Sequence, residues 1–127
     1  MEELYVYRVY GNVDPQAVKL PEIEGLRELW DATQERIRYL ALRKEYEEGF
    51  ITKLPPKPTA DVAGLRAQYP RADAYIYAMT WADVTHPKKA ALGKQAMERI
   101  AAGENHIKTI TDMQADWDAF QVAQMEG

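Results

Sequence analysis

The carboxylates that could do chemistry gather near the end of the chain. Asp112 and Asp116 are one helical turn apart, and Asp118 follows them closely. Paired carboxylates can share a proton or bind a hard cation, but a catalytic pair also needs a pocket with a second wall, and the sequence names none. A solvated patch without a role is the plainest interpretation. A binding face for a basic protein partner is the functional hypothesis, ahead of a catalytic pair.

A small group of basic residues is the second candidate site. It comprises Lys88, Lys89, Lys94 and Arg99, with Arg66 and Arg71 elsewhere in the same half of the chain. Lys88 and Lys89 stand at a predicted helix start, where positive charge is mildly unfavourable. A helix-turn-helix protein would use such an arrangement on DNA, although the turn residues are not those of that motif. A small DNA-binding regulator is therefore the alternative function.

The remaining reactive residue types form no recognised motif. His86 and His106 are twenty residues apart and cysteine is absent, so no known metal-site spacing occurs. Gly93-Lys94 lacks both the earlier glycine and the hydroxyl residue of a phosphate-binding loop. We therefore predict no metal, no cofactor and no enzymatic activity. A small-ligand site or enzyme built across helices, where tyrosine, histidine and aspartate meet in a pocket, is the third alternative.

Tyrosines near the N-terminus form a third candidate binding surface. The chain holds eight tyrosines and three tryptophans, and side chains of this kind are favoured at interfaces. Tyr5, Tyr7 and Tyr10 lie in a stretch of alternating residues that predicts a strand. One strand must pair with another strand, which segments 17–20 and 50–54 offer weakly, with a second protomer or with another protein. We expect this edge to bind a partner or a second copy.

The elements that must position these residues are mostly helices. Apolar spacing and end signals predict a long helix over 22–48, a short one over 62–69, helical structure over 70–103 and a last helix over 105–123. The 70–103 stretch is either two helices or one helix kinked at Pro87. The fold class is thus a mostly α bundle of four to five helices with a short N-terminal strand region.

The chain length predicts a single domain over residues 1–127. Its parts are a strand and long helix over 1–49, a proline-rich connector over 50–60, and a helical part over 61–127. We interpret Pro55–Pro58 as a stiff connector, with a recognition motif as the alternative. The predicted core comprises Trp30, Ile37, Leu40, Ile76, Met79, Leu92, Ile100, Ile110 and Trp117.

Composition and charge bound the class of protein. The net charge is −4 and the hydrophobic fraction is 46%, which argue for a globular chain and against non-specific nucleic-acid binding. No apolar run reaches the roughly 18 residues of a membrane span, and the acidic, alternating N-terminus is not that of a signal peptide. We expect a cytoplasmic protein without a membrane partner.

Several blocks resemble short uncharacterised proteins of prophages and other mobile elements of gut bacteria. They are YPRADAYIYA at 69–78, KAALGKQAMERIAAGE at 89–104, DMQADWDAF at 112–120 and LPEIEGLRELWDAT at 20–33. The resemblance implies a mobile-element context, in which small acidic proteins often inhibit host defence systems, as anti-CRISPR proteins do. It carries over no functional residues. Together with the missing catalytic motifs, it makes a non-enzymatic inhibitor of a nucleic-acid-handling protein the leading hypothesis.

Overall fold

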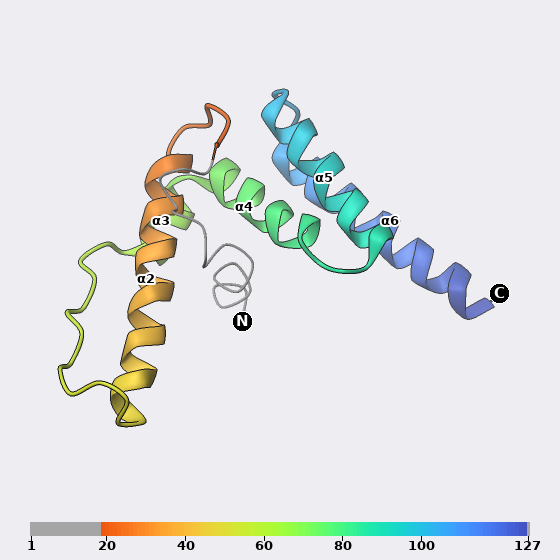
Figure 1. The fold of residues 1–127 in the computed structure, drawn as a ribbon. Helices are drawn as coiled ribbons and strands as arrows, with labels where there is room; N and C mark the ends of the chain where they lie inside the picture. Colours follow the sequence, from red (N-terminus) through yellow and green to blue (C-terminus); the bar gives the residue numbers. More distant parts are fainter. Residues whose placement is uncertain (1–18, 127) are drawn as a thin grey trace.

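The computed structural model describes residues 19–126, in which all regular structure is helical (Figure 1). The helices are α2 (Leu26–Glu47), α3 (Val62–Gln68), α4 (Pro70–Ala82), α5 (Pro87–Ala101) and α6 (His106–Glu126). The mostly α fold class is confirmed, whereas the predicted N-terminal strand lies outside the described residues. Segment 50–54, one of its proposed partners, has no strand structure.

The helices form an open arrangement with two projecting ends (Figure 1). α5 folds back on α4, α6 folds back on α5, and α2 packs on α3 and α4. Among the described helices, α2 does not pack along α6. The C-terminal half of α2 and the C-terminal end of α6 therefore point away from the core in different directions.

The long helix begins at Leu26, later than the predicted residue 22, because of Gly25. Gly25 has φ of 75°, a left-handed conformation that side chains other than glycine rarely adopt. A Cβ atom there would lie 2.2 Å from Cγ of Tyr69. The tyrosine ring therefore packs directly on the glycine backbone, and the chain turns before the helix instead of within it.

The stretch from 70 to 103 is two helices, so the alternative of a single kinked helix is wrong. Pro87 occupies the first turn of α5, where its missing N–H needs no partner. His86 caps this helix: Nδ1 of His86 accepts a hydrogen bond of 3.2 Å from the backbone N–H of Lys88. The ring nitrogen thus accepts the hydrogen bond that a hydroxyl or carboxylate oxygen usually accepts at a helix start.

Other helix ends follow the local signals of the sequence. Asp61 Oδ1 accepts from the N–H of Gly64 at 3.0 Å and caps α3, and Pro70 begins α4. Gly103, with φ of 99°, follows α5, and Asn105 Oδ1 accepts from the N–H of Lys108 at 2.9 Å at the start of α6. The predicted helix starts at residues 62 and 70 are confirmed, whereas the predicted end at 103 and start at 105 lie within two residues of the observed ones.

Close approach of α4 and α5 depends on a glycine. A Cβ atom at Gly93 would lie 2.4 Å from the backbone nitrogen of Ala82 and 2.8 Å from the carbonyl oxygen of Ala78. Ala96, one turn later on α5, is also buried. The two small residues, one helical turn apart, let the helix backbones meet.

The core has two connected parts. The first joins α2, α3 and α4 around Trp30, Ile37 and Ile76, with Ile100 reaching it from α5. The second joins α4, α5 and α6 through Ala78, Trp81, Leu92, Ala96 and Met113. Six of the predicted core residues are buried: Trp30, Ile37, Ile76, Met79, Leu92 and Ile100. Three others, Leu40, Ile110 and Trp117, are only half-buried.

Arg71 ties the start of α4 to the end of α5. Its guanidinium donates to the carbonyl oxygen of Glu104 at 2.9 Å and to that of Ile100. The cation thereby satisfies carbonyls that a helix end leaves without partners. None of the described helices is long and apolar enough to span a membrane.

Candidate functional site

The three predicted acidic residues of α6 do not share one face. Asp112 accepts from Lys108 Nζ at 3.0 Å and from Arg99 at 3.1 Å. These hydrogen bonds, that of Lys108 first, lower the pKa of Asp112. Asp116 and Asp118 are exposed, but two residues along a helix place them roughly 200° apart. Asp112 therefore serves the α5–α6 contact, and the other two carboxylates point in different directions.

The predicted basic residues of α5 are also divided. Arg99 pairs with Glu104 at 3.0 Å and with Asp112, and hydrogen bonds to these carboxylates raise its pKa. Lys94 is exposed and lies six residues beyond Lys88, about a third of a turn round the helix from it. The four side chains therefore form no continuous basic face.

Lys88 and Lys89 lie over aromatic rings. Lys89 Nζ is 4.7 Å from the ring centroid of Trp81 and 5.6 Å from that of Trp117, and Lys88 Nζ is 5.9 Å from that of Phe120. Such cation–π contacts contribute about 0.5–1 kcal/mol each at exposed sites. They offset the unfavourable position of these lysines at a helix start.

The same rings hold the turn between α4 and α5. The His86 ring lies edge-on to Trp117 and Phe120, with centroid distances of 5.0 and 5.6 Å. Trp117 in turn contacts Trp81 of α4 at 6.3 Å. This cluster fastens the turn onto α6, so His86, Lys88 and Lys89 have a structural role that their sequence positions did not indicate.

A shallow groove holds His106, the other candidate histidine. It has a volume of about 350 Å³ and runs between the α3–α4 corner and the start of α6. Its lining includes Arg66, Asp73, Tyr77, His106, Ile107 and Ile110. Arg66 and Asp73 form an ion pair of 2.9 Å at one wall. The groove is mainly apolar with a few polar groups, and it contains a histidine, as a small-ligand site built across helices requires.

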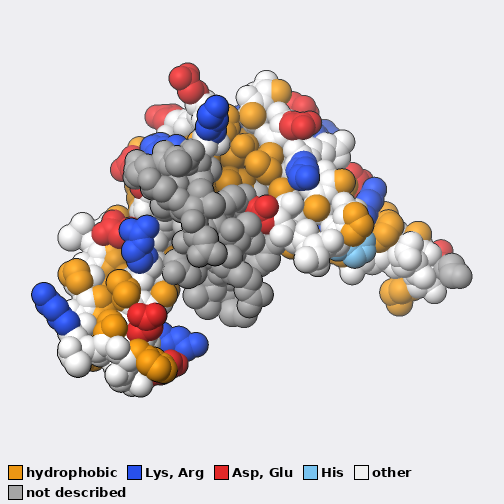
Figure 2. All heavy atoms as spheres, in the orientation of Figure 1, with side chains coloured by type: hydrophobic (Ala, Val, Ile, Leu, Met, Phe, Trp, Pro, Cys, Tyr) orange, Lys and Arg blue, Asp and Glu red, His pale blue; other side chains and the backbone are white. Residues whose placement is uncertain are grey.

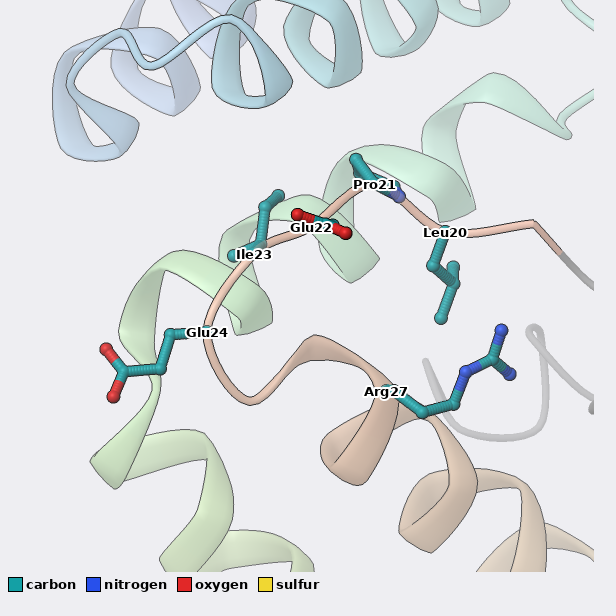
Figure 3. Close-up of a pocket in the computed structure, with 6 residues that line it drawn as sticks. All are labelled: Leu20, Pro21, Glu22, Ile23, Glu24 and Arg27. Atoms are coloured by element: carbon teal, nitrogen blue, oxygen red, sulfur yellow. The ribbon is translucent and has the colours of Figure 1, made fainter.

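A second hollow, of about 430 Å³, lies at the entry to α2 (Figure 3). The side chains of Leu20 and Arg27 converge there, and that of Glu24 points away. Arg27 pairs with Asp31 at 3.5 Å. The turn of residues 20–24 before α2 forms this hollow, and Glu22 and Arg27 are among the charged residues that line it.

Exposed apolar side chains gather at the projecting ends of the molecule (Figure 2). At the end of α2 and just beyond it, Phe50 is 77% exposed and Leu54 is 55% exposed, with Leu42 and Tyr46 also exposed. The sequence-based candidate sites do not include this surface, because the predicted core on the long helix ends at Leu40 and the residues beyond it are given no role. The signal was present in the run from Leu42 to Leu54, whose large apolar residues continue past the glycine that ends the helix.

The predicted tyrosine edge of Tyr5, Tyr7 and Tyr10 lies outside the described residues. Within residues 19–126, no three histidine, aspartate or glutamate side chains come together as a metal site requires. Comparison with protein-family models, curated proteins and solved structures found no match.

Proposed function

We propose that the protein is a small non-enzymatic binding protein of a mobile element. It inhibits a nucleic-acid-handling host defence protein by covering part of that protein's surface. The resemblance to short uncharacterised proteins of prophages and other mobile elements, a context in which small acidic proteins often inhibit host defences, motivates the inhibitor role. The exposed apolar surface at the end of α2 supports the binding role.

One observation carries the binding role, namely the projecting half of α2. Leu42 and Tyr46 are one turn apart on this helix, and Phe50 and Leu54 continue the apolar series beyond it. Exposing such side chains costs roughly 25 cal/mol for each Å² left in water. Contiguous surfaces of this kind mark sites of protein interaction in soluble proteins.

The electrostatic part of the proposal depends on fewer residues than the sequence suggests. Asp112 is occupied by Arg99 and Lys108, so attraction to a basic partner would depend on Asp116 and Asp118. Because these two carboxylates point to different sides of α6, they would attract a basic partner at long range but would not form one acidic contact surface.

Phage plating tests the inhibitor role. The protein would be expressed in bacteria that carry an active RNA-guided or restriction defence, and plaques of a targeted phage would be counted. We expect plating to rise with the wild-type protein and to fall back with F50E/L54E, which places charge on the α2 surface. A63E/A67E is the matched control, because Ala63 and Ala67 are exposed on α3 and the variant adds the same two charges.

The two parts of the proposal fail separately in this assay. Unchanged plating against every defence tested contradicts the inhibitor role. Raised plating that F50E/L54E fully retains contradicts the assignment of the α2 surface. Circular dichroism of each variant excludes unfolding as the cause.

Small-ligand binding is the second candidate, because the groove described above contains His106 and has a suitable volume. Filling the groove with I110W should abolish any thermal stabilisation by a small-molecule collection. The DNA-binding alternative draws less support, since Arg99 is paired with carboxylates and Lys88 and Lys89 contact rings.

A further inference from the structure

Two surfaces at different ends of the molecule have complementary chemistry. The first is the α2 tip, which comprises Leu42, Tyr46, Phe50 and Leu54 with the basic residues Arg38, Lys53 and Lys57. Arg38, Leu42 and Tyr46 follow one another at intervals of four residues and share a helix face. Lys53 and Lys57 are exposed in the connector beside Phe50 and Leu54. The tip is therefore apolar with a basic margin.

The second surface is the α6 tail, which comprises Asp118, Val122, Met125 and Glu126. α6 has 21 residues and α5 has 15, so the antiparallel α6 extends past the start of α5. Val122 is 51% exposed and Met125 is 86% exposed. Spacings of four, three and one residue place the four side chains on one side of the helix. The tail is therefore apolar with an acidic margin.

Neither surface is neutralised by its own chain. Near the tip, Arg43 and Lys44 pair with Glu47 and Glu48, but no ion pair joins Arg38, Lys53 or Lys57 to another described residue. Glu35 and Glu45 are the exposed carboxylates of this region that have no ion pair with a described residue. These basic residues thus outnumber the carboxylates that could offset them.

The tail has no basic residue of its own, because residues 109–126 contain neither lysine nor arginine. The lysines packed nearest to it, Lys88 and Lys89, contact Phe120 and Trp117. Those rings lie on the side of α6 that faces α4 and α5, away from Val122. The acidic margin is thus available to another molecule.

We propose that the protein self-associates head to tail, with the α2 tip of one copy on the α6 tail of the next. The tip and tail lie far apart on one molecule (Figure 1), so each copy has both ends free to pair. A contact of this heterologous kind builds chains or closed rings, not a twofold dimer. The inference rests on the proposed function only in that the α2 tip binds protein.

Sedimentation velocity measures this association directly. Each surface spans only a few helical turns, so we expect a weak contact that forms between about 5 and about 500 µM protein. The average mass should rise at least about twofold over this range at low salt. It should rise less at high salt, because screening weakens contacts between exposed charges.

Charge reversal at either end provides the decisive comparison. K53E/K57E gives an acidic tip, and D118K/E126K gives a basic tail, so each variant alone should remain monomeric. An equimolar mixture of the two should associate again, since acidic surfaces then meet basic ones. K19E/K94E is the matched control, because Lys19 and Lys94 are exposed outside both surfaces and the change in net charge equals that of K53E/K57E. This control should associate like the wild type.

A wild-type protein that stays monomeric over the whole range overturns the inference. So does a tail variant that associates normally, which would indicate a contact between two tips, or a mixture that stays monomeric. These results leave the proposed function intact if wild-type plating activity persists. Self-association without plating activity, in contrast, contradicts only the inhibitor role.

Discussion

Gly93→Ala distinguishes helix propensity from packing, because propensity predicts a more stable protein and packing predicts a less stable one. Alanine is better than glycine in a helix interior by about 0.8–1.0 kcal/mol. The added methyl group, however, would lie 2.4 Å from the nitrogen of Ala82, 2.7 Å from Cβ of Trp81 and 2.8 Å from the oxygen of Ala78. Backbone atoms cannot rotate away, so α5 must move off α4.

Overpacking of this kind costs about 1–3 kcal/mol, and two of the three contacts at Gly93 involve backbone, which favours the upper part of that range. When the gain in helix propensity is subtracted from this cost, we expect Gly93→Ala to lower the free energy of unfolding by about 1–2 kcal/mol. Urea unfolding followed by circular dichroism should show the midpoint falling by about 0.5–1 M, for a slope near 2 kcal/mol per M.

Ala91→Gly is the matched control, because Ala91 is exposed on the same helix. It should lose about 0.5–1 kcal/mol through propensity alone. A Gly93→Ala protein more stable than the wild type would refute the close approach of α4 and α5, since propensity would then act unopposed.

Two further substitutions probe the joints around α5. Asp112→Asn should destabilise the protein at neutral pH by removing the ion pairs with Lys108 and Arg99. Because the pKa of Asp112 is lowered in the folded state, its contribution is present above the unfolded value and disappears as pH falls through the folded one. The variant and the wild type should therefore have the same melting temperature in strong acid. A difference in melting temperature that persists at low pH would contradict the ion-pair role. His86→Ala should cost about 1–2 kcal/mol by removing the cap on Lys88 and the ring contacts. His86→Asp, which restores only a cap, should recover part of this loss in the same melting assay, and no recovery would argue against capping.

Local signals in the sequence account for several of the helix ends. The cap at Asp61, proline at position 70 and the glycine at 103 act through neighbouring backbone groups, so no distant contact is needed to recognise them. The start of α2 is different. Gly25 turns left-handed against the ring of Tyr69, which is far away in sequence.

The roles of the candidate site residues were harder to predict, because the role of a charged side chain depends on which groups from other helices contact it. Asp112 and Arg99 belonged to two opposed hypotheses, yet the structure pairs them with each other. Lys88 and Lys89 stand in a plausible nucleic-acid patch by sequence, but their ammonium groups lie over rings of α4 and α6. Apolar spacing could not show that residues such as Phe50 are exposed, because spacing indicates which residues share a face but not whether another segment covers that face.

The sequence by itself determined the helical class, the breaks between helices and the small residues that allow two helices to meet. Each of these follows from spacing and backbone preference within a few residues. Only the tertiary structure decided that α2 and α6 project from the core, and that Asp112 faces Arg99. Those outcomes depend on which helix faces bury each other, and that choice is made by contacts between segments far apart in the chain.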